Sequence, residues 1–175
     1  MEEHSTIVDT TDAEIPRGNI ILFGRHGDLK PENILWYPDS DSKGRHGVLK
    51  ITDFGAAHFS TYDRRSLTDR KYRKMPKLFT HRSPEFDIGE TCSTLCDIWS
   101  LGCIFLEFIT WYFGGPKYVL AFTEKRLAPD RHLKWKPSDT FFTTFEEAGT
   151  WKAVVKPAVL EVGDLSSGFW SESLN

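Results

Sequence analysis

The segment Leu95–Tyr112 constrains the fold of this 175-residue chain more than any other part of it. Read as a helix, it is hydrophobic nearly all round, and such a helix requires packing partners on every side. Its most apolar stretch, Leu101–Phe113, contains Glu107 and is shorter than the roughly 20 apolar residues that span a bilayer. Gly114–Pro116 should stop the helix. We therefore expect a core helix of a soluble domain, buried on all sides.

Other segments have weaker patterns. Ile34–Tyr37 and Val48–Thr52 are apolar runs separated by turn formers, which predicts a small hairpin. Ile20–Phe23 could end a helix or form a short strand, and Phe145–Lys156 is compatible with a helix. A composition of 39% hydrophobic residues can fill the core of about one domain. The expected fold class is mainly α with a small β-hairpin.

Charge and cysteine content exclude several classes of protein. The net charge of −3 does not favour nucleic acid or an anionic membrane as the main partner. Residues 1–16 are acidic and end at a proline, so we expect a flexible tail and no signal peptide. Cys92, Cys96 and Cys103 lack CxxC spacing, which favours reduced thiols of an intracellular protein over disulfides or a metal site.

A basic surface loop is expected between Ser60 and Lys77, where the sequence is polar and without periodicity. Within loop 64–77 there are seven basic residues and one acid: Arg64, Arg65, Arg70, Lys71, Arg73, Lys74 and Lys77, with Asp69. Such a cluster is most often a solvated face. The alternative is that loop 64–77 binds a phosphate, an acidic substrate or a protein partner.

The segment HGDLKPENIL, from His26 to Leu35, carries the strongest chemical signal. Phosphoryl transfer needs a carboxylate that orients the attacking hydroxyl, and oxygen ligands for the magnesium that bridges the phosphates. Asp28 could supply that base, and Asn33 and Asp53 could supply metal ligands. Lys30 could reach the transferring phosphate and offset its charge. Taken singly, each of these residues would more often be structural, as a turn former or a turn cap.

Four motifs in order resemble those of the protein kinase family. They are His26–Asn33 of the catalytic loop, Asp53–Gly55 (DFG), Ser83–Glu85 (for Ala-Pro-Glu) and Asp97–Gly102 (DIWSLG). The resemblance covers roughly residues 18–115. It implies the helix-rich carboxy-terminal lobe, with Asp28 as base, Lys30 as phosphate contact, Asn33 and Asp53 as magnesium ligands, and ATP and Mg²⁺ as cofactors. Lys30–Glu32 matches the Ser/Thr-kinase variant, and the combination of motifs is similar to kinase-like proteins of filamentous fungi.

Some residues of these motifs have structural roles in the family, and some depart from its pattern. Asp97 should brace the backbone of the catalytic loop, and His26 should pack beneath it. Glu85 should pair with a buried arginine far downstream, for which the sequence offers no clear equivalent. Gly27 stands where many kinases carry an arginine that clamps a phosphorylated loop. Leu78 stands where Ser/Thr kinases place a threonine that bonds the catalytic residues.

The part of the family fold that covers ATP has no counterpart in these 175 residues. No lysine precedes Lys30, and the region before it has no Gly-rich loop pattern. We therefore expect the kinase amino-terminal lobe to be absent and the nucleotide to bind weakly. The expected organisation is a tail over 1–16, a partial kinase domain over 17–157 and an irregular tail over 158–175.

Three functions fit these residues. The first is transfer of the γ-phosphate of ATP to Ser or Thr of a protein substrate, weak or absent in this short chain. The second is a non-catalytic, pseudokinase-like interaction module. The third is a small-molecule phosphotransferase, which shares an HGD…N loop, but the DFG and Ser-Pro-Glu motifs argue against it. We expect an intracellular protein with no nucleic-acid or membrane partner.

Overall fold

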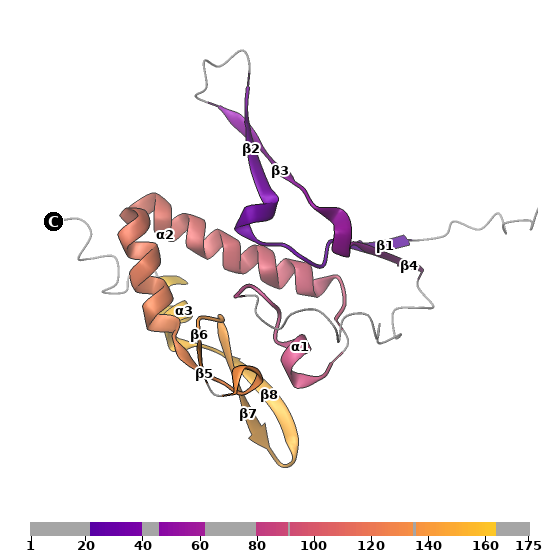
Figure 1. The fold of residues 1–175 in the computed structure, drawn as a ribbon, viewed down its shortest axis with the longest axis vertical. Coiled ribbons are helices and arrows are strands. Elements are labelled where there is room, and N and C mark those ends of the chain that lie inside the picture. Colours follow the sequence, from indigo (N-terminus) through magenta and orange to yellow (C-terminus); the bar gives the residue numbers. More distant parts are fainter. Residues whose placement is uncertain (1–21, 40–45, 62–79, 91, 135, 164–175) are drawn as a thin grey trace, which may run out of the picture.

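A computed structural model describes residues 22–39, 46–61, 80–90, 92–134 and 136–163. Its elements in chain order are β1 (Leu22–Arg25), η1 (Pro31–Asn33), β2 (Ile34–Pro38), β3 (Gly47–Ile51), η3 (Phe54–Ala56), β4 (His58–Thr61), α1 (Glu85–Ile88), α2 (Leu95–Arg126), β5 (Ala128–Asp130), η6 (Arg131–Leu133), β6 (Lys136–Ser138), β7 (Phe142–Glu147), β8 (Thr150–Val155) and α3 (Pro157–Gly163). Helix α2 runs between the hairpin β2–β3 on one side and the elements α1 and β5–β8 on the other (Figure 1).

The predicted helix is confirmed, but it is longer than expected. α2 has 32 residues and changes direction at Gly115, whose φ of 68° and ψ of −170° are not helical. Pro116 follows, and its ring is favourable in the first turn of a new helical segment. Gly115 and Pro116 therefore bend the element where termination was expected, and the helix continues to Arg126 (Figure 1).

The expectation that this helix is buried on every side is wrong. Cys103 and Ile104 are buried, but large apolar side chains on other faces are exposed. They are Leu95, Ile98, Phe105, Ile109, Trp111, Tyr112, Phe113 and Leu120. The described elements pack against only part of the helix surface. The remaining apolar side chains of α2 are therefore exposed.

Helix α2 also satisfies, by length and composition, the requirement for crossing a membrane, and it alone does so within the described ranges. The core helix of a globular domain passes the same test. Only part of this helix is buried, and Glu107 on it forms ion pairs with His81 and Arg126.

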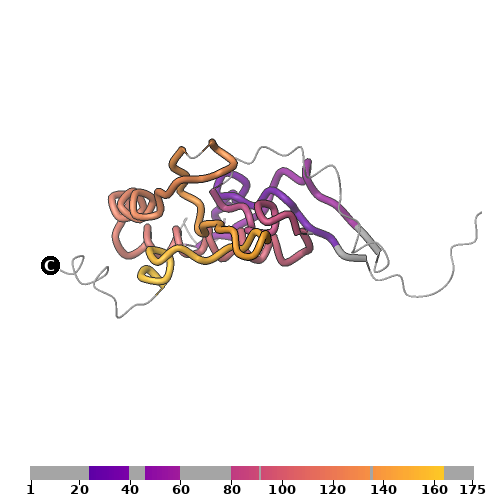
Figure 2. Tube along the Cα trace, turned by 90° about the horizontal axis from the view of Figure 1, so that it is seen from below, coloured from indigo at the N-terminus to yellow at the C-terminus, as the bar shows by residue number. Residues whose placement is uncertain are grey.

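The core joins both segments of α2 to the carboxy-terminal elements. Its buried cluster consists of Cys103, Phe122, Phe141, Val159 and Val162, with Trp99, Leu106 and Val155 packed against it. Helix α3 supplies the two valines at 159 and 162, so residues 158–163 are not the irregular tail that the sequence indicated. In Figure 2 the yellow helix α3 lies beside the second segment of α2.

The strand content is larger than one small hairpin. The predicted hairpin is confirmed as β2–β3, paired from Ile34↔Ile51 to Pro38↔Gly47. Three further antiparallel pairs, β1–β4, β5–β6 and β7–β8, complete four two-stranded ladders in the described part of the chain. Of the ambiguous segment Ile20–Phe23, the described residues Leu22 and Phe23 lie in strand β1, which pairs with β4 beyond the DFG motif.

The segment Phe145–Lys156 is not a helix. Most of it belongs to hairpin β7–β8, whose turn is Ala148–Gly149. Both turn residues have positive φ, 51° and 75°, which is the geometry of a two-residue type I′ turn. The alternation of half-buried Trp151, Ala153 and Val155 with exposed residues is the sequence signal of strand β8.

Candidate active site

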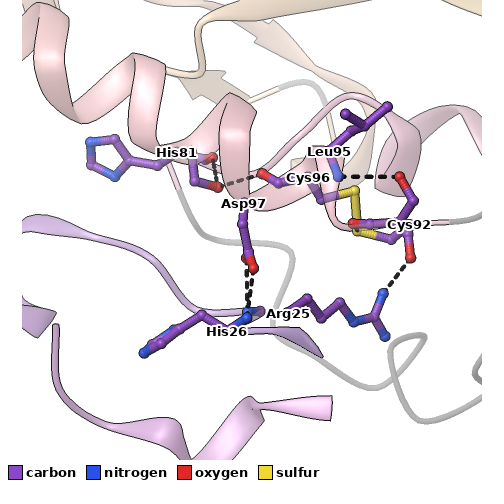
Figure 3. The surroundings of a disulfide bond; sticks show 10 residues. Arg25, His26, His81, Cys92, Leu95, Cys96 and Asp97 are labelled. Carbon is purple, nitrogen blue, oxygen red and sulfur yellow. Dashed lines mark hydrogen bonds between the residues drawn. A yellow bond between two sulfur atoms is a disulfide. The ribbon is translucent and has the colours of Figure 1, made fainter. Parts of the chain in front are cut away.

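The catalytic loop is held by an aspartate from the start of α2. Asp97 Oδ2 accepts the backbone N–H of His26 at 2.6 Å, and Oδ1 accepts that of Gly27 at 2.9 Å. Gly27 has a φ of 79°, which glycine adopts without the cost that a side chain would bring. Figure 3 shows the carboxylate of Asp97 directed at this backbone. The expected bracing role of Asp97 is confirmed.

His26 is a structural residue, as its position beneath the loop suggested. Its side chain is buried, and Nε2 lies 2.9 Å from the carbonyl oxygen of Thr52. The ring also packs against Phe54, with 5.0 Å between centroids. His26 thereby ties the catalytic loop to the DFG segment.

Three of the four predicted site residues are in direct contact. Lys30 Nζ lies 2.8 Å from Asp28 Oδ2, and Asn33 Nδ2 donates to the same oxygen at 3.1 Å. Asn33, the one buried residue of turn η1, also donates from Nδ2 to the main-chain oxygen of Asp28 at 2.8 Å. Because the amide nitrogen faces Asp28, the amide oxygen Oδ1 is the atom of Asn33 that could bind a metal.

Lys30 is held in its charged form. The hydrogen bond to Asp28 raises the pKa of Lys30 above its ordinary value and outweighs the opposing effect of burial. The negative charges of Asp28, Glu32 and Asp53 act in the same direction. A permanently protonated ammonium at this position is suited to balance phosphate charge.

Asp53 reaches the same region through the neighbouring strand. The backbone N–H of Thr52 donates to the carbonyl oxygen of Asn33 at 2.9 Å, which places Asp53 one residue from that contact. Asp53 itself is exposed and has left-handed backbone geometry, with φ 61° and ψ 70°. Its Oδ1 accepts the N–H of Gly55 at 3.2 Å. The other carboxylate oxygen, Oδ2, is the atom of Asp53 that could bind a metal.

The Ser-Pro-Glu segment is anchored by a charge network that the sequence did not reveal. Arg82 is buried and forms a two-pronged bond to Asp87, with 2.8 Å from Nη2 to Oδ2. The same nitrogen donates to Asp130 at 2.6 Å, from the carboxy-terminal part of the chain. Glu85 Oε2 is buried and has no hydrogen-bond partner in the described structure.

A second buried network lies beside the first. Glu107 of α2 bonds His81 Nε2 and Arg126 Nη2, each at 2.8 Å. The Arg126 side chain is fully buried between Phe122 and Phe141, whose ring centroids are 4.0 and 4.1 Å from its guanidinium carbon. Burial alone would raise the pKa of Glu107, but the hydrogen bond from His81 and the charge of Arg126 lower it below its ordinary value.

The expectation of three reduced thiols is wrong for two of them. Cys92 and Cys96 form a disulfide, with their Cα atoms 5.9 Å apart, while Cys103 is free and buried as expected. Sequence reasoning rejected the pair for lack of CxxC spacing. The turn that leads into α2 instead brings together two cysteines four residues apart. Figure 3 shows this disulfide beside Asp97.

Some sequence expectations lie outside the described residues. They are the tail over 1–16, the basic loop 64–77 and the departure at Leu78. No group of three or more His, Cys, Asp or Glu side chains is arranged to hold a metal ion within the part of the chain that the structure describes. A metal site of Asn33 and Asp53 would not appear as such a group, because it contains only one of these four residue types and Asn33 contributes an amide oxygen.

Comparison with known proteins supports the resemblance. The protein kinase domain family matches residues 23–118, which is more than half of the chain. Cyclin-dependent kinase 2 of Caenorhabditis elegans is 45% identical over 83 residues, covering 47% of this chain and 19% of that protein. Cyclin-dependent kinase E-1 of Arabidopsis thaliana is 37% identical over 86 residues, covering 49% of this chain and 17% of that protein. Protein kinase MCK1 of Saccharomyces cerevisiae is 37% identical over 100 residues, covering 55% of this chain and 24% of that protein.

The matched part of the chain thus spans only about a fifth of the length of these relatives. It contains the catalytic loop, the DFG segment, the Ser-Pro-Glu segment and the first part of α2, in the order that the motifs indicated. On this match, and on the contacts of Asp28, Asn33 and Asp97, the chain belongs to the protein kinase family.

Proposed function

We propose that this chain is the catalytic-loop portion of a Ser/Thr protein kinase, the carboxy-terminal lobe by the family's description. Its residues would take part in the transfer of the γ-phosphate of ATP to a Ser or Thr hydroxyl of a protein substrate. The observation that carries the proposal is the contact of both Lys30 and Asn33 with one carboxylate oxygen of Asp28. That arrangement matches what phosphoryl transfer requires of the protein.

The donor set fits magnesium and ATP. Magnesium prefers oxygen ligands, and the Asn33 amide oxygen with the Asp53 carboxylate would supply two of them. Bound magnesium and ATP would supply the transferable phosphoryl group and the charge that neutralises it. Asp28 would orient the attacking hydroxyl and accept its proton, and Lys30 would hold a positive charge against the phosphate oxygens.

Release of Asp28 is part of this assignment. In the structure, Oδ2 of Asp28 accepts hydrogen bonds from Lys30 and Asn33. A metal ligated by Asn33 and a phosphate near Lys30 would draw both donors toward the nucleotide. The carboxylate of Asp28 would then be open to a substrate hydroxyl.

Nucleotide binding by the 175-residue chain tests the proposal. Titration with Mg–ATP in a calorimeter should show binding that Asp53→Asn weakens by about tenfold or more, because a charged metal ligand is lost. Glu146→Gln removes one carboxylate from an exposed strand position and should leave the affinity unchanged. Equal affinity for wild type and Asp53→Asn would contradict the assignment of Asp53.

Phosphate transfer tests the role of Asp28 separately. With a Ser/Thr peptide library as acceptor, transfer should fall in Asp28→Asn while Mg–ATP affinity is retained, since the base is not a metal ligand. Loss of phosphate transfer together with Mg–ATP affinity would assign Asp28 to nucleotide binding.

A non-catalytic interaction module is the second candidate, and the exposed apolar surface favours it. Hairpin β2–β3 exposes Trp36, Tyr37, Val48 and Leu49, and α2 exposes its own apolar side chains. Surfaces of this kind mark protein–protein contacts. An absence of Mg–ATP binding, together with partner binding that Asp28→Asn leaves unchanged, would favour this function. For either function we propose an intracellular protein without a nucleic-acid or membrane partner.

A further inference from the structure

The Cys92–Cys96 disulfide closes a five-residue loop, CSTLC, over the first turn of α2. The helix begins at Leu95, and its cap residue Thr94 makes no side-chain capping bond. Asp97 lies in the same first turn. First turns are where helices fray. Here the N–H groups of Leu95 and Cys96 donate to Ser93, and that of Asp97 donates to the main-chain oxygen of Thr94. A covalent link from Cys96 back to Cys92 therefore holds the turn that carries Asp97.

The disulfide loop also contacts the strand that leads into the catalytic loop. The guanidinium of Arg25, one residue before His26, donates to the main-chain oxygen of Cys92. One end of the disulfide is thus bonded to the strand that enters the catalytic loop. The other end is one residue from Asp97, which accepts the N–H groups of His26 and Gly27 (Figure 3).

We propose that the Cys92–Cys96 pair is a thiol–disulfide switch that controls how firmly Asp97 holds the catalytic loop. The inference rests on the proposed function, whose catalytic loop it regulates. Disulfides are uncommon in intracellular proteins, and those that occur there are usually transient and redox-sensing. The five-residue loop also constrains the unfolded chain less than a long one, so the bond's contribution to global stability lies at the low end for disulfides.

The chemistry requires a dithiol reductant. A thiolate of the dithiol attacks Sγ of Cys92, which is partly exposed, and Cys96 leaves as a thiolate from its buried position. The N-terminus of α2 favours that negative charge. The second thiol of the reductant then displaces Cys92. Two protein thiols and one oxidised reductant result, with the protons of the dithiol ending on Cys92 and Cys96.

Hydrogen exchange of the full chain, without nucleotide, tests the switch. The chain is oxidised with glutathione disulfide or reduced with dithiothreitol, and the loss of two hydrogens is verified by mass spectrometry. Amide exchange of His26 and Gly27 should be about tenfold faster in the reduced form, because the turn carrying Asp97 opens more often. Amides of Thr143 and Val154 in hairpin β7–β8 are the internal control and should not change.

The variant Cys92→Ser should show the fast exchange in both buffers, and the oxidant should have no effect on it. Unchanged exchange of His26 and Gly27 between the two verified states would overturn the proposal. Failure of the folded chain to form the bond with glutathione disulfide would overturn it as well. A chain that shows the exchange difference but binds no Mg–ATP would contradict the proposed function and support the switch. A chain that binds Mg–ATP with equal exchange in both states would do the reverse.

Discussion

Asp97 illustrates how one residue can determine the geometry of a site that it does not itself enter. Both of its carboxylate oxygens accept backbone N–H groups, at His26 and at Gly27. These two residues immediately precede Asp28, so the direction of the Asp28 side chain depends on where Asp97 fixes the backbone. Such a residue acts on chemistry only through position.

Replacing Asp97 by alanine should lower the free energy of unfolding by about 2–3 kcal/mol, because two N–H groups lose their acceptors. Urea denaturation followed by circular dichroism measures this. Glu90→Ala, at an exposed position, is the control and should stay within about 0.5 kcal/mol of wild type. An Asp97→Ala variant as stable as the control would show that the two bonds contribute nothing to the folded state.

At the residue scale, the sequence predicted the contacts within the catalytic loop. Asp28, Lys30 and Asn33 lie within six residues, and the loop geometry that joins them is local. Arg82 was not predicted as a network residue, because neither Asp87, five residues away, nor Asp130, 48 residues away, stands in a recognisable pattern with it. The disulfide escaped because its spacing becomes favourable only where a turn enters a helix.

At the scale of elements, the end of α2 is joined to the carboxy-terminal strands by a buried lysine. Lys156 Nζ donates to the main-chain oxygens of Arg126 and Ser138, at 2.6 and 3.0 Å, and to Thr140 Oγ1 at 3.2 Å. Burial lowers the pKa of Lys156 to about 8. One ammonium group thus satisfies acceptors at the end of α2, in β6 and just before β7.

Lys156→Met should lower the free energy of unfolding by about 3 kcal/mol, because it removes at nearly constant volume a buried donor that makes three hydrogen bonds. The control is Lys152→Met on β8, where the lysine forms an exposed ion pair with Glu147 that contributes about 0–1 kcal/mol. Thermal unfolding by calorimetry compares the two. Equal losses for both variants would mean that the buried bonds of Lys156 do not hold these elements together.

Element prediction from the sequence succeeded where a single pattern dominated. Hairpin β2–β3 has two apolar runs around turn formers, and α2 is apolar throughout its first half. It failed at β7–β8, where a two-residue turn at Ala148–Gly149 divides a segment that was expected to be compatible with a helix. Strand β1 was ambiguous because its partner β4 follows only after the DFG segment.

For the molecule as a whole, ion pairs at the centre of the described structure make stability depend on pH. The pKa of Glu107 is lowered in the folded state, so its contribution is fully present above the unfolded-state pKa of about 4.3 and disappears as pH falls through the lower folded value. Glu107→Gln should be less stable than wild type at about pH 7, and the difference should shrink toward about pH 3. Urea unfolding at both pH values measures it, with exposed Glu146→Gln as control. A difference that stays constant with pH would contradict the direction of the shift.

The central claim is that Asp28, Asn33 and Asp53, from two neighbouring turns, gather around one metal-bound nucleotide. Paramagnetic broadening by Mn²⁺ with ATP tests it most directly, since broadening falls steeply with distance from the metal. We predict strong broadening of the Asn33 side-chain amide and of the Asp53 backbone amide, lost together in Asp53→Asn. Broadening of only one of the two, or of neither, would contradict it.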